Sequence, residues 1–391
     1  MHNRNETLAV MEGSVNMKKV IVVGAGILGA SAAYQLAKLG AEVLIIDRKD
    51  KGQATDAAAG IICPWLSQRR NKAWYQLAKE GARFYPELIE ELKGEGETET
   101  GYAQVGALNV HHDIEKIRKM EERAETRKAD APEIGEIVPL DEKETRDRFP
   151  LLSEQYQSVY VSGGARVDGR ALRDALLRSA QRNGAILLTG NAVLQYEANR
   201  VTGVTVGNES YSADEVIVCA GAWANQLLAP LGVDFKVSFQ KAQILHVEVP
   251  EASDTSAWPV VMPPSNKYIL AFDHQRVVIG ATHEDPANGY DTRITAGGMQ
   301  ELLDKGLEAA PGLSNSIFQE VRVGFRPYTA DFLPVIGPIP GWEGLIVANG
   351  LGASGLTTGP YLGNQLAKMA LEMDIDIDIS YYDVQKAMGD N

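Results

Sequence analysis

The stretch from 18 to 48, KKVIVVGAGILGASAAYQLAKLGAEVLIIDR, constrains the fold of this chain more than any other. Its apolar, mostly β-branched residues at 20–23 are typical of a parallel strand that is buried on both faces. Three glycines in the pattern G-x-G-x-x-G follow, and then come small residues at helical spacing, a second apolar run and an aspartate. The pattern predicts strand, turn, helix and strand, which is how an α/β fold with a parallel sheet begins.

Each glycine of this motif has its own physical role. Gly24 allows a tight turn, Gly26 lets the backbone approach a pyrophosphate, and Gly29 lets the helix pack closely on the strand. The start of the helix offers free N–H groups and a partial positive charge to phosphates. Asp47 ends the second strand, where a carboxylate accepts hydrogen bonds from a ribose diol. We therefore predict a dinucleotide site rather than a turn without a ligand.

Length and composition narrow the class of protein. The chain has 391 residues, more than one ordinary core holds, so we expect two domains. A net charge of −14 argues against a nucleic-acid partner, which needs a basic face. Two distant cysteines, Cys63 and Cys219, indicate free thiols rather than a disulfide framework or a metal site. With no apolar run of the roughly 18 residues that span a bilayer, we predict a cytoplasmic protein; peripheral membrane association is the alternative.

Two further segments carry the small residues that a close ligand requires. KGQATDAAAGIICP, 51–64, has one hydroxyl, on Thr55, and can run along a dinucleotide or form a plain loop. DEVIVCAGAWANQLL, 214–228, predicts a buried strand that is closed by Ala220 and Gly221. Trp223 stands beside them and either covers a ring of the ligand or packs in the core.

A second helix start near the C-terminus decides between nicotinamide and flavin. GLIVANGLGASGLTTGPYLGNQLAKMALE, 344–372, predicts a strand, a glycine loop and a helix. Because proline is tolerated only in the first turn of a helix, Pro360 places the helix start near 357–359. A nicotinamide dinucleotide needs only one helix N-terminus, whereas the N1–C2=O edge of a flavin becomes negative on reduction and is stabilised by a second one. We therefore favour FAD, with an NAD(P)-linked dehydrogenase as the alternative.

The remaining segments predict a second domain and its binding group. Residues 233–320 alternate like a large antiparallel sheet, with Tyr268 in one of its strands, and 86–149 resemble a peripheral insertion. GFRPYTADFLPVIG, 324–337, holds one arginine in apolar surroundings. Arg326 precedes a proline and is therefore extended, and its guanidinium can hold a carboxylate through two charge-assisted hydrogen bonds. An internal ion pair, for example with Asp331, is the alternative.

Together these segments resemble the D-amino acid oxidase and glycine oxidase family of FAD-dependent amine oxidoreductases, which includes sarcosine oxidase-like enzymes. The resemblance covers about 17–375 through VGAGILG, TDAAAGI, AGAWA, VIGAT, GFRPYTADFLPVIG and GLGASGLTTGP. It implies an α/β fold with a Rossmann-like FAD-binding domain formed by 17–85, 150–232 and 321–375. It also implies an α+β substrate domain on a large, mostly antiparallel sheet, formed by 86–149 and 233–320. We expect 1–16 to be a disordered extension, with Met17 as an alternative start.

The resemblance also implies site residues. Arg326 would pair with the substrate carboxylate, assisted by Tyr268. The implied FAD contacts, with Trp223 added from the pattern above, are Gly24, Gly26, Ile27, Leu28, Asp47, Arg48, Thr55, Ala59, Gly60, Ile61, Val193, Ala220, Gly221, Trp223, Gly352, Ala353, Ser354, Gly355 and Leu356. The cysteine or histidine that attaches FAD covalently in some relatives has no counterpart here, so we expect noncovalent FAD. The glycine loop lacks the second arginine that glycine oxidases often place there, which argues against glycine as the substrate.

The expected reaction is oxidation of the C–N bond of a small amino acid or N-alkyl amino acid of the glycine, sarcosine or D-amino acid class. Hydride would pass to flavin N5, and the imine would hydrolyse. The electron acceptor would be O2; a dehydrogenase that passes electrons to a quinone or a partner protein is the alternative, and a flavoprotein with a non-catalytic role is a third reading. A homo-oligomer is compatible with the sequence.

Overall fold

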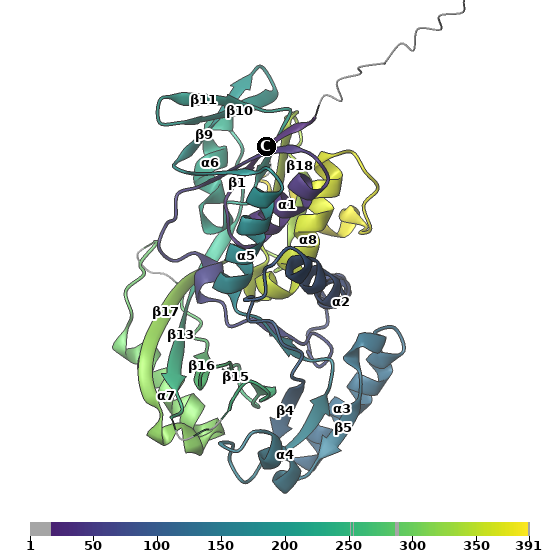
Figure 1. Ribbon diagram of the computed structural model, residues 1–391, viewed down its shortest axis with the longest axis vertical. Coiled ribbons are helices and arrows are strands. Elements are labelled where there is room, and N and C mark those ends of the chain that lie inside the picture. Colours follow the sequence, from purple (N-terminus) through teal and green to yellow (C-terminus); the bar gives the residue numbers. More distant parts are fainter. Residues whose placement is uncertain (1–16, 251, 253, 286–288, 390–391) are drawn as a thin grey trace, which may run out of the picture.

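The computed structural model describes residues 17–250, 252, 254–285 and 289–389. The predicted N-terminal extension, 1–16, lies outside the described residues. The chain forms two large sheets, and helices gather around the first of them (Figure 1). It is a mixed α/β fold, as the sequence predicts.

The first sheet has six strands in the order β18-β19-β12-β1-β2-β8. Their bounds are β1 Lys19–Val23, β2 Glu42–Asp47, β8 Ile186–Thr189, β12 Glu215–Val218, β18 Val335–Pro338 and β19 Leu345–Asn349. All neighbours are parallel except β18, which runs antiparallel to β19. A smaller sheet of β9 Ala192–Glu197, β10 Arg200–Val206 and β11 Glu209–Ser212 lies beside it.

Both faces of the six-stranded sheet are buried, which explains the unbroken apolar run at its centre. Val20 and Val22 of β1 pack into the cluster that holds the helices. Ile21 and Val23 point to the opposite face and pack with residues of β9 and β10, such as Val204. Side chains alternate along a strand, so every residue of β1 has to be apolar.

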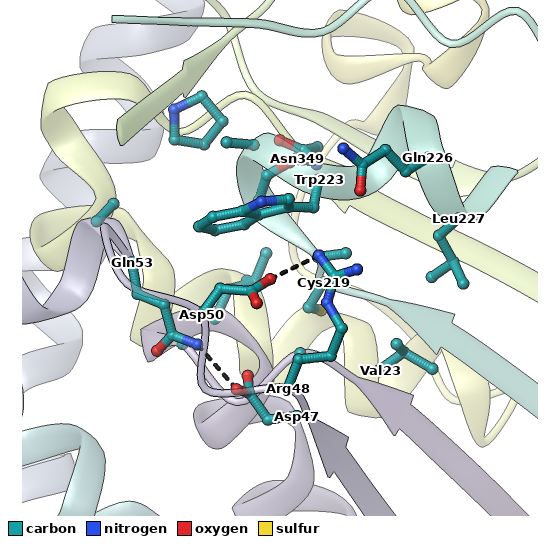
Figure 2. A pocket seen from close by; sticks show the side chains of 18 of the residues that line it. Val23, Asp47, Arg48, Asp50, Gln53, Cys219, Trp223, Gln226, Leu227 and Asn349 are labelled. Atoms are coloured by element: carbon teal, nitrogen blue, oxygen red, sulfur yellow. Dashed lines mark hydrogen bonds and ion pairs between the residues drawn. The ribbon is translucent and has the colours of Figure 1, made fainter. Parts of the chain in front are cut away.

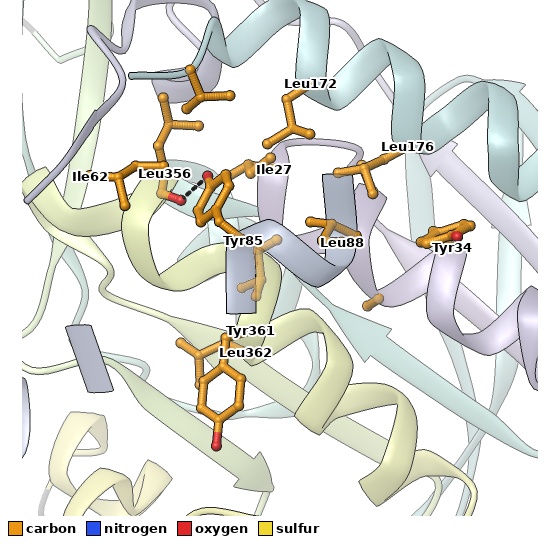
Figure 3. Close-up of a cluster of buried hydrophobic side chains, with 14 of the residues drawn as sticks. Ile27, Tyr34, Ile62, Tyr85, Leu88, Leu172, Leu176, Leu356, Tyr361 and Leu362 are labelled. Atoms are coloured by element: carbon orange, nitrogen blue, oxygen red, sulfur yellow. Dashed lines mark hydrogen bonds between the residues drawn. The ribbon is translucent and has the colours of Figure 1, made fainter. Parts of the chain in front are cut away.

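Four helices cover the first of these faces: α1 Ile27–Lys38, α2 Lys72–Gly94, α5 Gly169–Arg182 and α8 Gly355–Ala370. They meet in one apolar cluster that contains Tyr34, Leu88, Leu172 and Leu362 (Figure 3). Helix α1 packs closely on α8, and Ser31 lies against Gly363 with no room for a larger residue there.

The predicted start of the last helix was wrong by two to four residues. Helix α8 begins at Gly355, so Pro360 lies inside it rather than in its first turn. A proline in a helix leaves the carbonyl four residues earlier without its N–H donor. That carbonyl belongs to Leu356, and the Tyr85 hydroxyl donates to it at 2.5 Å (Figure 3). A side chain from α2 therefore replaces the missing backbone bond.

The second sheet has eight strands in the order β17-β13-β16-β15-β14-β4-β6-β5. Their bounds are β4 Ala107–His111, β5 Ile137–Leu140, β6 Gln157–Val161, β13 Ser238–Glu248, β14 Val260–Met262, β15 Tyr268–Ala271, β16 Arg276–Gly280 and β17 Ile317–Tyr328. Pairing is antiparallel except between β14 and β4. Helix α7, Ala296–Ala309, packs on one face near β13 and β16, and α3, Ile114–Lys128, and α4, Glu142–Arg148, lie by β5 and β6 (Figure 1).

The division into an FAD-binding and a substrate domain at the stated boundaries stays a prediction. The strand pairing assigns two segments to a different sheet from the one that the predicted domain boundaries imply. Strand β6, which lies within 150–232, and the last part of β17, residues 321–328, belong to the eight-stranded sheet, although both segments were assigned to the FAD-binding domain. Strand β17 continues to Tyr328, so Arg326 lies near the end of a strand of the eight-stranded sheet.

Candidate functional site

A cavity of about 360 Å³ opens where four strands of the six-stranded sheet end. Val23, Asp47, Cys219 and Asn349 lie at or beside the carboxyl ends of β1, β2, β12 and β19 and line it (Figure 2). In open α/β sheets, ligands bind outside the carboxyl ends of the strands, where the chain direction of the connections reverses. The cavity is therefore where the sequence motif predicts the dinucleotide.

Two of the three glycines of the motif, Gly24 and Gly29, leave no room for a side chain. Gly24 has a φ of +104°, and a Cβ there would lie 2.3 Å from the carbonyl oxygen of Cys219. A Cβ on Gly29 would lie 1.8 Å from the carbonyl oxygen of Gly24. Helix α1 then begins at Ile27, so its first turn offers N–H groups that have no intrahelical acceptor.

The carboxylate of Asp47 is held rigidly at the cavity wall. Its Oδ2 accepts from the Ala25 N–H at 2.6 Å, and its Oδ1 accepts from the Lys49 N–H at 2.5 Å and from Gln53 Nε2 at 2.8 Å (Figure 2). The residue is 9% exposed. A carboxylate has about four lone-pair positions, so three bonds leave capacity for a ribose hydroxyl.

The two other polar residues predicted here are also engaged. The Thr55 hydroxyl accepts from the Ile27 N–H at 2.9 Å, so it organises the helix start and keeps its own proton to donate. Arg48 pairs with Asp50 at 2.6 Å and donates to Asn191 Oδ1 at 3.2 Å (Figure 2). Both side chains line the cavity.

Most of the predicted FAD contacts line the cavity. Those that do are Gly24, Gly26, Ile27, Leu28, Asp47, Arg48, Thr55, Val193, Ala220, Gly221, Trp223, Gly352 and Gly355. Ala59, Gly60, Ile61, Ala353, Ser354 and Leu356 are not among its lining residues. Gly60 and Ile61 instead lie against 166–167, where Gly60 leaves no room for a side chain. Their contacts with FAD stay predictions.

Trp223 is partly buried between the cavity and other aromatic rings, and its role as a cover for a ring of the ligand stays a prediction. It lines the cavity. Its ring also stacks on Tyr290 with centroids 5.3 Å apart and meets Phe325 edge-on at 6.1 Å. Aromatic packing of this kind fixes the indole as a rigid wall.

Sequence reasoning missed several lining residues, among them Gln53, Asn349 and Leu351. Asn349 donates to the Gly221 carbonyl at 2.9 Å and accepts from the Gly350 N–H at 2.7 Å, so it joins two ligand loops. A polar residue at the end of an otherwise apolar strand was the available signal for Asn349. Gln53 had no such signal, since its role depends on the fold of the loop after β2.

Arg326 and Tyr268 share one face of the eight-stranded sheet. Arg326 on β17 pairs with Gln240 on β13, and Tyr268 on β15 pairs with Gly280 on β16. Gly280 is also paired with Ile244 of β13, which lies four residues after Gln240. Because side chains alternate along a strand and paired residues share a face, Arg326 and Tyr268 point to the same face of the sheet. A Cβ on Gly280 would lie 2.5 Å from the Tyr268 ring, so that ring lies across β16.

The two side chains are electrostatically coupled. Burial raises the pKa of Tyr268, and the charge and hydrogen bonding of Arg326 oppose that rise. The Nη1 of Arg326 is fully buried and has no hydrogen-bond partner among the described residues. No carboxylate of the described chain forms an ion pair with it, and Asp331 is exposed. A buried guanidinium nitrogen without a partner is costly, so this atom calls for a partner that the described chain does not supply.

Comparison with known proteins places the chain in a family. The model of the family DAO, FAD dependent oxidoreductase, matches residues 19–369. An uncharacterized oxidoreductase of Bacillus subtilis, YurR, is 58% identical over 95% of this chain and all of its own length. The crystal structure of iminodiacetate oxidase from Chelativorans sp. BNC1 superposes with a TM-score of 0.90 at 46% identity and covers 93% of this chain and 98% of its own. Glycine oxidase of Pseudomonas putida is 28% identical over 88% of this chain and 92% of its own length.

The chain therefore belongs to the DAO family of FAD-dependent oxidoreductases. It is an enzyme that oxidises an amine or amino acid, and its cofactor is FAD. The cavity fits this group, because a glycine turn without space for Cβ atoms, the Asp47 carboxylate and the starts of α1 and α8 all meet there. In the described part of the chain, no helix has both the length and the apolar character to cross a membrane.

Proposed function

We propose that this enzyme oxidises the C–N bond of an N-substituted amino acid whose carboxylate is held by Arg326. The observation that carries the proposal is the buried Nη1 of Arg326, which lacks a partner in the described chain. It lies on the sheet face that also carries Tyr268. Phe325 and Pro327, on either side of Arg326, line the FAD cavity. A carboxylate bound there would therefore lie next to the cofactor.

The chain's own residues position the substrate. Arg326 offers two parallel N–H donors to the carboxylate, and the Tyr268 hydroxyl adds a third. Because the pKa of Tyr268 is raised by burial, the hydroxyl stays protonated and donates throughout the neutral range. A bound carboxylate fixes the α-carbon, and fixing it removes much of the entropic part of the barrier.

FAD, when bound, would supply the redox chemistry, namely the acceptance of two electrons and the α hydrogen of the substrate as hydride. The substrate becomes an imine, and water converts this imine to a 2-oxo acid and an amine. Gly352 and Gly355 place the start of α8 at the cavity. Its N–H groups stabilise negative charge that develops there.

The similarity supports a secondary amine rather than glycine. The relative named iminodiacetate oxidase is 46% identical, whereas the relative named glycine oxidase is 28% identical. Iminodiacetate is a secondary amine with two carboxymethyl arms. The glycine loop of this chain also has Ala353 and Ser354 where a second arginine is expected in glycine oxidases.

An anaerobic visible spectrum tests the proposal. The purified yellow protein is titrated with iminodiacetate, sarcosine, glycine, D-alanine, D-proline and L-proline. We expect loss of the flavin absorbance with iminodiacetate or sarcosine at the lowest concentrations. Admission of air then distinguishes the acceptors, because an oxidase regains its colour and forms H2O2, whereas a dehydrogenase that uses a quinone or partner protein stays bleached. A protein that bleaches with no carboxylated amine contradicts the proposal.

A further inference from the structure

Arg69 is a cation without a counter-ion, and it lies against the loops around the proposed site. The residue is half-buried, and no acidic side chain of the described chain forms an ion pair with it. Its guanidinium stacks on the ring of Trp74, 4.9 Å from the centroid, and donates to the carbonyl of Phe332. Partial burial lowers its pKa, as expected for a guanidinium that loses water and gains no carboxylate.

The two neighbours of Arg69 are Trp74, in the first turn of α2, and Phe332, in the loop after β17. Trp74 donates its indole N–H to the Ser354 hydroxyl at 2.9 Å. Ser354 lies in the glycine loop, and Gly352 of that loop faces the carbonyl of Pro327. Phe332 follows Arg326 on the same segment, where its ring stacks on Tyr328 with centroids 4.9 Å apart. These contacts join the Arg69 guanidinium to the segment that carries Arg326.

The loop that carries Arg69 is held in place by two arginines of helix α3. Arg127 donates to the carbonyls of Trp65 and Ser67, at 2.5 and 2.8 Å, and Arg123 donates weakly to the carbonyl of Leu66. Neither arginine forms an ion pair among the described residues. Arg69, Arg123 and Arg127 thus meet at 64–70 without an ion pair among the described residues, although the chain has a net charge of −14. Such a local concentration of positive charge attracts anions.

We propose that Arg69 is the second anion-binding residue of the substrate site, so that the preferred substrates are secondary amines with two carboxylates. Arg326 holds the carboxylate of the arm that is oxidised, and Arg69 holds the carboxylate of the other arm. The inference rests on the proposed function and deepens it. Arg69 would supply the second positive charge that the glycine loop lacks, because it is linked to that loop through Trp74 and Ser354.

A matched pair of ligands isolates the second carboxylate. Thiodiacetate and (methylthio)acetate have the same thioether and one carboxylate in common, differ by the other carboxylate, and lack the amine that the enzyme oxidises. Their dissociation constants are measured from the perturbation of the flavin spectrum in the FAD-loaded enzyme. The variants are Arg69→Gln, Arg69→Lys and, as a control, Arg70→Gln, since Arg70 is the exposed neighbour.

We expect Arg69→Gln to weaken thiodiacetate roughly tenfold to a hundredfold, the usual loss for a hydrogen bond to a charged group. The dissociation constant of (methylthio)acetate should change less than about twofold, Arg69→Lys should recover part of the loss, and Arg70→Gln should have no effect. An equal loss for both ligands in Arg69→Gln would show that Arg69 only supports the loop, and it would overturn the inference. Unchanged binding of thiodiacetate would overturn it as well.

Turnover separates failure of this inference from failure of the proposed function. If the wild-type enzyme oxidises sarcosine at least as well as iminodiacetate, the second-carboxylate inference is wrong while the proposed function stands. If it oxidises no carboxylated amine of the panel, both are wrong. The expected result is a higher kcat/KM for iminodiacetate, which falls to the sarcosine level in Arg69→Gln.

Discussion

The cofactor cavity and the substrate-binding face are built by different means. The cavity is formed largely by backbone: a glycine turn, two helix starts and strand ends, with Asp47 as its fixed acid. The substrate-binding face is formed by side chains of a sheet, with Arg326 and Tyr268 on different strands of it. Backbone sites tolerate no added atoms, whereas side-chain sites depend on what each group offers. The two regions should therefore respond differently to substitution.

The largest effect is expected at the glycine turn. Gly24→Ala places a Cβ 2.3 Å from the Cys219 carbonyl, at a φ of +104°, so the turn has to open and FAD should be lost almost completely. FAD content per chain, measured by absorbance after gel filtration, checks this. Gly40→Ala is the matched control, because its φ is also positive but no atom lies within 4 Å of the added carbon. It should cost only about 1 kcal/mol of stability and retain FAD.

A glycine-to-alanine substitution at Gly280 should affect substrate binding and leave FAD binding intact. A Cβ there would collide with the Tyr268 ring, which can move because it is a side chain. We expect Gly280→Ala to retain FAD and to raise KM roughly tenfold to a hundredfold, since the hydroxyl is displaced from a charged partner. Tyr268→Phe should raise KM by no more than Gly280→Ala does. Loss of FAD in Gly280→Ala would contradict the separation of the two regions.

His246, further along β13, should make the stability of the folded chain depend on pH. Burial, and then the charges of Arg322 and Arg276, lower the pKa of His246 from 6.5 to about 3, with Glu320 and Asp168 opposing them. Between pH 6.5 and pH 3, His246 is protonated in the unfolded chain and neutral in the folded chain. The free energy of unfolding therefore falls as the pH drops below about 6.5. Between pH 7 and pH 5 this amounts to roughly 2 kcal/mol.

The measurement is urea unfolding at pH 7 and pH 5 in wild type, His246→Gln and His112→Gln. His246→Gln should lose less stability than wild type over this interval. His112 is exposed, so its substitution should leave the wild-type difference unchanged. Equal losses in all three proteins would show that His246 is not buried in its neutral form.

The smallest effect is expected where a side chain supports the backbone of the cavity region. Tyr85→Phe removes the donor to the Leu356 carbonyl, which Pro360 leaves without an N–H. An unpaired buried carbonyl costs about 1–3 kcal/mol, so the melting temperature should fall by roughly 2–4 °C. In the double variant Tyr85→Phe, Pro360→Ala, the alanine N–H supplies the missing donor, and most of the loss should be recovered. If the losses of the two single variants simply added in the double variant, the proposed link between Tyr85 and Pro360 would be contradicted.

The contrast between the two regions also explains what the sequence could predict. Spacing predicts the turn at Gly24, the helix after it and the acid at Asp47, because those constraints act within a few residues along the chain. The second helix start near the C-terminus favours FAD, and the family resemblance adds the substrate-binding roles of Arg326 and Tyr268. The role of Tyr85 lies outside both, since it depends on the contact of α2 with α8.

Arg69 was also beyond sequence reasoning. Its significance depends on Trp74, Ser354 and Phe332, which come together only in the folded chain. The start of α8 was misplaced for a related reason. A rule about proline in isolated helices predicts a late start, but a tyrosine from another helix satisfies the carbonyl that the rule assumes is lost.

The most direct test of the account is the effect of Arg326→Gln on substrate and cofactor binding measured in the same preparation. Arg322→Gln is the matched control, because Arg322 lies four residues earlier on β17 and is paired with Glu320. For the substrate that bleaches the flavin in the anaerobic titration, the account predicts that Arg326→Gln raises KM at least about 30-fold, as expected when a buried charged partner is lost. FAD content should stay at the wild-type level, and Arg322→Gln should change KM less than about threefold. An unchanged KM in Arg326→Gln, or an equal rise in Arg322→Gln, would contradict the account.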